Sequence, residues 1–264
     1  MQGKRRPLQR VVEGLARWLG PHASMWTLLA LGLALSLGFS WAGGEVYESV
    51  VEKGSLAAMD QPVLAEAVAL RSPSLDAAVT AFTNLAGGVA APIIAVVAMV
   101  VLAVWMRHWR PLVLVPAAGV GSLLMTLFGK QLAGRARPPL DLAVPPYEYS
   151  ASFPSGHTLN ATVIAGVVVY LICLRLRRAW ARAVTITVGG LYASAVGFSR
   201  VFLGHHWLTD VIAGWLLGCA WLTVVIVAHQ VFHLVRHSRS TPGSAKGAHD
   251  GGGELPPSSS SRPG

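Results

Sequence analysis

Residues 154–174 read PSGHTLNATVIAGVVVYLICL, a short polar motif followed directly by an apolar run. In the motif, Ser155 is predicted to be the N-cap of a helix, and Gly156 lets the backbone approach a neighbouring group closely. The run Thr158–Leu174 contains no Asp, Glu, Lys or Arg. With its ends stretched, it reaches the length that crosses a bilayer. This stretch predicts a transmembrane helix that carries a polar cluster in its first turn.

The chain contains further uncharged apolar runs of this kind: Met25–Trp41, Val89–Met106, Leu112–Phe128, Ala183–Phe198 and Val211–Val231. The composition of the 264 residues agrees, because 53% are hydrophobic and only 12% are charged, whereas a soluble domain has about 25% charged residues. We therefore predict an all-α fold, a bundle of six transmembrane helices. Cys173 and Cys219 lie in apolar runs and are interpreted as packed thiols, not as a disulfide or a metal site.

The 21 basic residues are distributed unequally between the two sides of such a bundle. If the chain crosses the membrane six times, 15 of them lie on the side of both termini and six on the other side. The positive-inside rule places the side with the excess in the cytoplasm, so both termini are predicted to be cytoplasmic. The formal net charge of +9 follows from this topology, and no nucleic-acid partner is predicted.

The predicted organisation has three parts. Residues 1–22 form a basic cytoplasmic N-terminus, residues 23–237 a transmembrane catalytic domain, and residues 238–264 a disordered Gly/Ser/Pro-rich cytoplasmic tail. In the outer segment 43–88, the apolar spacing of Pro62–Leu70 predicts a helix on the membrane surface. A signal peptide ending near Ser40-Trp41-Ala42 is an alternative for the first run. That run is longer than the usual hydrophobic core of a signal peptide. Cleavage there would not change the side of the membrane on which the later segments lie.

Three polar clusters interrupt the apolar pattern, and all are predicted on the extracytoplasmic face: Lys130–Pro138, Pro154–His157 and Ser199–Asp210. Together they hold cations, histidines, a serine and a carboxylate, a combination that suits a phosphate group. Lys130 supplies a point charge, whereas Arg137 and Arg200 can each bind two oxygens with a planar guanidinium. The free N–H groups at the helix start after Ser155 add an anion site.

His206 is the predicted nucleophile, because Asp210 follows it by four residues. If the last helix has begun by His206, both side chains share one face, with Cβ atoms about 5–6 Å apart. The carboxylate would fix the imidazole tautomer and leave the other nitrogen to attack phosphorus. His157 would protonate the leaving oxygen and later activate water. This scheme requires no metal and no cofactor, because three cations neutralise the phosphate.

The motifs K-x6-R-P at Lys130–Pro138, P-S-G-H at Pro154–His157 and S-R-x5-H-x3-D at Ser199–Asp210 resemble, in this order, those of the type 2 phosphatidic acid phosphatase (PAP2) superfamily. This superfamily also includes the vanadium haloperoxidases. Each fixed position is matched over residues 130–210, and the helix pattern extends the resemblance over about 25–235. The resemblance implies a membrane lipid phosphatase with a phosphohistidine intermediate and the residue roles given above. The implied substrates are phosphatidate, phosphatidylglycerophosphate or undecaprenyl diphosphate.

Three other polar features receive structural interpretations. Arg135 is interpreted as a headgroup anchor, and His205 as a space-filling neighbour of His206. His229 and His233 lie one turn apart near the cytoplasmic end, without a third ligand, and are interpreted as interfacial packing and not as a metal site.

Two further functions remain as alternatives. A phosphotransferase of the same fold would pass the phosphoryl group to an alcohol or a sugar. A transporter or lipid-binding scaffold is disfavoured, because the six apolar runs contain no Asp, Glu, Lys or Arg and the ionisable residues gather at their outer ends. A haloperoxidase is disfavoured because the pocket is built into a membrane bundle. The predicted partners are a lipid phosphate and the bilayer, and no feature points to a particular oligomeric state.

Overall fold

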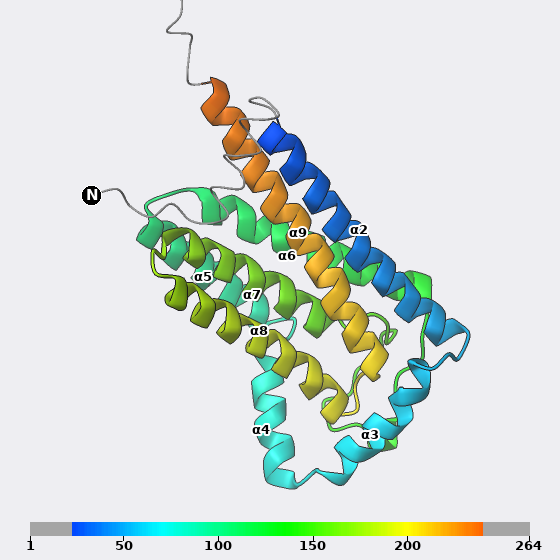
Figure 1. Cartoon of the computed structure of the whole chain (residues 1–264). Coiled ribbons are helices and arrows are strands. Elements are labelled where there is room, and N and C mark those ends of the chain that lie inside the picture. Colours follow the sequence, from blue (N-terminus) through cyan, green and yellow to red (C-terminus); the bar gives the residue numbers. More distant parts are fainter. Residues whose placement is uncertain (1–22, 240–264) are drawn as a thin grey trace, which may run out of the picture.

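The computed structural model describes residues 23–239, and these residues form helices without any strand (Figure 1). The helices are α2 (Ala23–Val51), α3 (Asp60–Ala69), α4 (Pro73–Asn84), α5 (Ala90–Met106), α6 (Arg110–Ala133), α7 (Gly156–Arg175), α8 (Ala179–Phe202) and α9 (Leu208–Arg239). Two short 3-10 turns, η1 (Ala57–Met59) and η2 (Leu140–Leu142), lie in the connecting segments. The predicted all-α fold is confirmed.

Each of the six predicted apolar runs corresponds to a helix of its own, although Val89 is the N-cap of α5 and not part of it. Within the described residues, five helices are long and apolar enough to cross a membrane, namely α2, α6, α7, α8 and α9. Helix α5 is strongly apolar but has 17 residues, so the number of six crossings stays a prediction. The chain is a multi-pass membrane protein. Helix α9 continues to Arg239, past the predicted domain end at 237, whereas the predictions for 1–22 and for 240–264 fall outside the described residues.

Helix α7 is the centre of the bundle and packs against α5, α6, α8 and α9. Its residues Leu159, Val163, Val167 and Leu171 repeat every four positions and are fully buried. This spacing keeps one stripe of the helix in contact with its neighbours. By contrast, many large apolar side chains on the outer helices are more than half exposed, which fits surfaces that face lipid tails.

Two glycines bring the start of α9 close to the start of α7. A Cβ atom at Gly214 would lie 3.0 Å from the carbonyl oxygen of Ser155, and one at Gly218 would lie 2.9 Å from Cβ of Thr162. Small residues four positions apart permit such close helix contacts in membranes. This contact places the third sequence motif beside the second.

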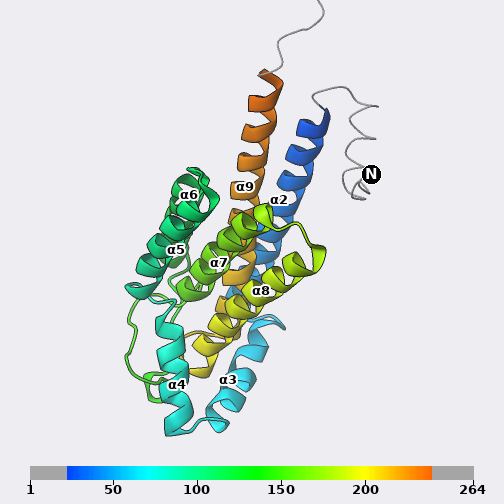
Figure 2. The same ribbon diagram turned by 90° about the vertical axis from the view of Figure 1, so that its left-hand side faces the viewer.

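Helices α3 and α4 lie at one end of the bundle, where α8 ends and α9 begins (Figures 1 and 2). Helix α3 matches the predicted surface helix, although it begins at Asp60. Arg71, between α3 and α4, donates to the carbonyl oxygens of Phe202 and Leu142, each at 2.6 Å. The segment between α2 and α5 is therefore fixed to the loops that carry the three motifs.

Candidate active site

The three motifs meet at this end of the bundle. Lys130 lies in the last turn of α6, and the helix stops at Gly134, whose φ of +55° lets the chain turn toward Arg137. Arg200 lies in the last turn of α8. The following turn uses Gly204 at φ +73°, where a Cβ atom would lie 2.4 Å from the carbonyl oxygen of Leu142. This tight passage leads the chain to His206.

His206 and Asp210 form a buried pair, but by a different local geometry from the expected one. Helix α9 begins only at Leu208, so the assumption that it has begun by His206 is wrong. Asp210 lies in the first helical turn and accepts from the backbone N–H of Trp207 at 2.9 Å. Its Oδ2 is 3.4 Å from Nδ1 of His206. The other ring nitrogen, Nε2, lies 3.3 Å from Nη1 of Arg137.

The environment of His206 favours the neutral imidazole. Burial lowers its pKa to about 4, although the hydrogen bond and the charge of Asp210 act in the opposite direction. A group with this pKa carries no proton charge at neutral pH, so one ring nitrogen holds a free electron pair. Because Nδ1 faces the carboxylate, Nε2 is the nitrogen available for attack on an electrophile.

The three predicted phosphate-binding cations surround this imidazole. Lys130 donates to Ser150 Oγ at 3.0 Å and to the carbonyl oxygen of Ala151. Arg137 donates to the carbonyl oxygen of His205 at 2.6 Å, which fixes its guanidinium beside the histidine pair. Arg200, which is only 2% exposed, pairs with the same carboxylate as Arg137, that of Glu148. The positive charges are thus concentrated around a single point at the bundle end.

Glu148, which the sequence analysis does not single out, lies among these cations. Its carboxylate binds Arg137 Nη2 at 2.8 Å and also binds Nη2 of Arg200, and it lies 4.0 Å from Nδ1 of His157. Burial alone would raise the pKa of Glu148, but the charge of Arg200, that of His206 in its protonated form and that of Arg137 outweigh this effect and lower the pKa to about 2. Glu148 is therefore an anion in the place where three predicted phosphate-binding residues and a histidine converge.

The second motif has the expected position and an unexpected side-chain contact. Ser155 is the N-cap residue of α7, yet its hydroxyl makes no cap hydrogen bond and accepts instead from Thr158 Oγ1 at 2.9 Å. The first N–H groups of the helix are therefore left for another acceptor. Gly156 and His157 line the adjoining cavity, and a Cβ atom at Gly156 would lie 2.9 Å from Thr126 Cγ2.

The interpretation of Arg135 as a headgroup anchor is wrong. Its guanidinium bridges two buried carboxylates, with 2.6 Å from Nη1 to Asp210 Oδ1 and 2.6 Å from Nη2 to Asp60 Oδ2. Asp60 also accepts from the backbone N–H of Thr209 at 2.9 Å and from its hydroxyl at 2.8 Å. A second serine, Ser152, donates to the other oxygen of Asp210. These contacts fix the carboxylate behind His206.

The other histidines lie in packing environments. His205 is buried, and its Nε2 lies 2.7 Å from the carbonyl oxygen of Val144. At the opposite end of the bundle, His229 Nδ1 is 2.6 Å from the hydroxyl of Tyr170, and its ring stacks edge-on to that of His233.

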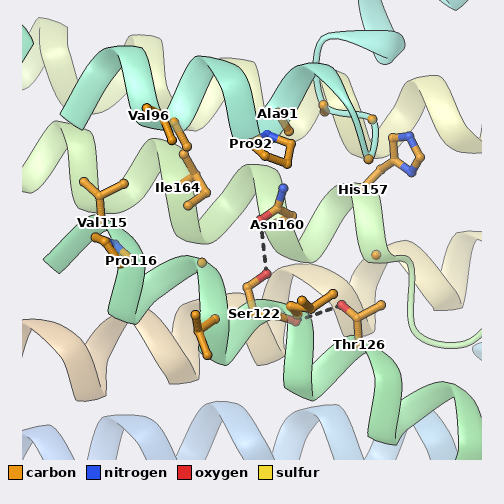
Figure 3. Close-up of a pocket in the computed structure, with 18 of the residues that line it drawn as sticks. Ala91, Pro92, Val96, Val115, Pro116, Ser122, Thr126, His157, Asn160 and Ile164 are labelled. Atoms are coloured by element: carbon orange, nitrogen blue, oxygen red, sulfur yellow. Dashed lines mark hydrogen bonds between the residues drawn. The ribbon is translucent and has the colours of Figure 1, made fainter. Parts of the chain in front are cut away.

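A cavity of about 580 Å³ extends from the polar cluster between α5, α6 and α7 (Figure 3). Its polar end is formed by Lys130, Glu148, His157 and His206. Its other walls are mainly apolar and include Ala91, Pro92, Val96, Val115, Pro116 and Ile164. The cavity therefore joins a charged site at the bundle end to an apolar space among the helices.

Comparisons with known proteins match this arrangement. The family model of the PAP2 superfamily matches residues 81–233. A phosphatidylglycerophosphatase B of Bacillus subtilis is 30% identical over 175 residues, which cover 66% of this chain and 84% of that protein. An undecaprenyl-diphosphatase of Sulfolobus acidocaldarius is 38% identical over 82 residues, which cover 31% of this chain and 34% of that protein. The crystal structure of a transmembrane PAP2-type phosphatidylglycerolphosphate phosphatase from Bacillus subtilis has a TM-score of 0.68 and 26% identity, covering 74% of this chain and 96% of that one.

Proposed function

The chain belongs to the PAP2 superfamily and is a membrane phosphatase, and from this premise we propose that it hydrolyses a lipid phosphate or diphosphate through a phosphohistidine at His206. One observation carries the proposal. His206 directs one ring nitrogen at Asp210 and presents the other beside Arg137, in the wall of a cavity that is charged at one end and apolar at the other.

In the first step, the phosphate oxygens bind Lys130, Arg137, Arg200 and the N–H groups at the start of α7. The lone pair on His206 Nε2 forms a bond to phosphorus, and the bond from phosphorus to the lipid oxygen breaks. His157 gives its proton to that oxygen, so the lipid leaves as an alcohol. The cations stabilise the charge that develops on the equatorial oxygens.

In the second step, His157, now neutral, accepts a proton from a water molecule. The water oxygen attacks phosphorus, and the electron pair of the P–N bond returns to His206. Inorganic phosphate then leaves. Charge neutralisation by three side chains requires no divalent ion, so activity in EDTA is part of the proposal.

Glu148 supports this assignment of the phosphate position. Its carboxylate makes the ion pairs with Arg137 and Arg200 that the oxygens of a bound phosphate would make. Glu148 lines the cavity, whereas the two arginines lie behind it. An arriving substrate must therefore displace this carboxylate, which acts as a stand-in for the phosphate in the free enzyme.

The apolar part of the cavity supports a lipid as the substrate. Its lining residues Val96, Val120 and Leu123 are each more than half exposed on the outside of α5 and α6. A lipid tail can therefore remain in the bilayer while its phosphate reaches His206. The names of the relatives favour phosphatidylglycerophosphate or undecaprenyl diphosphate as substrates, and the basic residues favour a site on the extracytoplasmic face.

The test is phosphate release by purified protein in detergent, with phosphatidate, phosphatidylglycerophosphate and undecaprenyl diphosphate, each with and without EDTA. We expect release from at least one lipid at an undiminished rate in EDTA. Product formation only with an added alcohol or sugar acceptor would instead identify a phosphotransferase. Loss of activity that a divalent ion alone restores would refute the metal-free mechanism.

The covalent step has its own test. Brief incubation with a 32P-labelled lipid phosphate, followed by an alkaline quench, should trap label on the wild-type chain that acid releases. His206→Ala should carry no label and show no turnover, yet still bind orthovanadate. His205→Gln is the matched control, because it alters the adjacent histidine and should retain both label and turnover. A labelled or active His206→Ala variant would exclude this nucleophile.

A further inference from the structure

A polar pair lies inside the otherwise apolar part of the cavity. Asn160 on α7 and Ser122 on α6 both line it, and Ser122 Oγ lies 3.4 Å from Asn160 Oδ1 (Figure 3). Asn160 follows His157 by three residues, which corresponds to about 4.5 Å along a helix. The pair is therefore about one turn deeper in the bundle than the histidine beside the phosphate site.

The amide nitrogen of Asn160 is available to a ligand. Among residues 23–239, no side chain or backbone group accepts a hydrogen bond from Nδ2. Figure 3 shows this nitrogen directed toward Ala91 and Pro92 on the far wall of the cavity, where the side chains are apolar. A polar donor in an apolar environment is costly unless it finds an acceptor. A molecule bound in the cavity can supply this acceptor.

Two classes of lipid monophosphate differ at this depth. In a glycerolipid phosphate, the glycerol backbone and its ester carbonyl groups follow the phosphate within a few bonds. In a polyprenyl phosphate, the phosphate oxygen is attached directly to hydrocarbon. Among lipid monophosphates, only the glycerolipid offers strong acceptors about one helical turn below phosphorus, whereas in a diphosphate the inner phosphate offers acceptors there.

We propose that Asn160 is a specificity-determining residue that donates from Nδ2 to an ester carbonyl oxygen of a glycerolipid phosphate. This inference rests on the proposed lipid phosphatase function and assigns the class of lipid monophosphate that the site prefers. A polyprenyl phosphate would leave the amide without an acceptor, so the site discriminates against it. Discrimination by an unpaired polar group is stronger than discrimination by apolar contact alone.

The competing explanation is that Asn160 only joins α7 to α6. Polar side chains do hydrogen-bond between transmembrane helices. The contact with Ser122, however, uses only the amide oxygen, and it does not account for the direction of the NH₂ group into the cavity. Substituting Asn160 and Ser122 one at a time therefore separates the helix contact of the amide oxygen from the ligand contact of the amide nitrogen.

The experiment compares three monophosphates in detergent: dioleoyl phosphatidate, its diether analogue, which lacks the carbonyl oxygens, and geranylgeranyl phosphate. The wild type should prefer the diester over the diether by about three- to tenfold in kcat/KM, the size of one hydrogen bond. Asn160→Leu, which replaces the amide by an apolar group of similar size, should lower kcat/KM for the diester by this factor. It should bring the diester-to-diether ratio close to one and should not lower kcat/KM for the other two substrates.

Ser122→Ala is the matched control, because it removes the interhelical contact and keeps the amide. Its diester-to-diether ratio should equal that of the wild type. Equal losses on all three substrates in Asn160→Leu, or the same change of ratio in Ser122→Ala, would overturn the proposal. If Asn160→Leu does not fold, a wild-type ratio near one overturns it as well. Failure of the wild type to release phosphate from any lipid would instead refute the proposed function.

Discussion

The acidity of His206 governs how the proposed enzyme responds to pH. Because burial lowers its pKa to about 4, the imidazole stays neutral, and able to attack, until the pH falls to about 4. A free imidazole would lose this ability already near pH 6.5. We therefore expect the acid limb of kcat/KM in the wild type near pH 4.

The Asp210→Asn variant shows whether the acid limb belongs to His206 or to the substrate. Ionisation of the substrate affects the wild type and the variant equally, whereas the pKa of His206 differs between them. Asp210 opposes the effect of burial on His206, so its neutralisation should move the acid limb to lower pH. It should also reduce kcat, because the tautomer is no longer fixed. A pH series on both proteins is the measurement. A wild-type limb between pH 6 and 7 that the substitution does not move would contradict the assignment.

The carboxylate of Glu148 should weaken the binding of phosphate-like anions. Its pKa of about 2 keeps it charged at every working pH, so it competes permanently for Arg137 and Arg200. Glu148→Gln removes the negative charge while keeping the size of the side chain. We expect the inhibition constant of orthovanadate to fall by about tenfold, as for the loss of one competing charge-assisted contact.

The matched control for this substitution is Asp141→Asn. Asp141 is an exposed carboxylate in the same loop, so its replacement makes the same change in net charge away from the cations. Inhibition by orthovanadate should then stay within about twofold of the wild type. Unchanged or weaker inhibition of Glu148→Gln would show that the carboxylate does not occupy the phosphate position.

At the scale of the elements, Arg135 couples α3 to the start of α9. It is held between Asp60 on α3 and Asp210 on α9 and donates to Thr209 at 2.7 Å. A lysine at this position keeps the charge but cannot make the same set of planar contacts. Arg135→Lys should therefore leave Asp210 less well oriented and lower kcat by about tenfold with little change in KM.

Arg71→Lys is the control, because Arg71 also fixes the segment between α2 and α5 but, within residues 23–239, donates hydrogen bonds only to the carbonyl oxygens of Phe202 and Leu142. It should lower the thermal midpoint while kcat stays within about twofold. Steady-state kinetics and thermal unfolding of both variants test this distinction. An equal loss of kcat in the two variants would assign Arg135 a general structural role.

The helices were predictable from the sequence because each depends on a continuous local pattern. The apolar runs place α2 and α5–α9, and the surface helix appears as the apolar spacing in Pro62–Leu70. Local patterns do not report which distant charges meet. Asp60 and Glu148 stand in polar segments without a motif, so no local signal distinguishes them from ordinary surface carboxylates. Arg135 was misinterpreted for the same reason, since its partners are 75 residues away on either side.

At the scale of the whole molecule, the sequence predicted that three separated motifs meet, and the described residues do bring them to one end of the bundle. This followed from counting the membrane crossings between the motifs, not from any contact. The meeting of the motifs does not fix the direction in which the bundle is inserted in the membrane, because a bundle with all its charged motifs at one end can be inserted either way. Only the unequal distribution of basic residues, with 15 on the side of the termini and six on the other, favours an extracytoplasmic site.

This orientation predicts the accessibility of two exposed positions at opposite ends of the bundle. Asp141 lies in the loop of the proposed site, and Arg177 lies between α7 and α8. In chains whose native Cys173 and Cys219 are replaced by Ala, a membrane-impermeant maleimide added to intact cells should label Asp141→Cys. Arg177→Cys should be labelled only after the membrane is permeabilised. The opposite labelling pattern would place the phosphate site in the cytoplasm, where lipids of the inner leaflet would be the substrates.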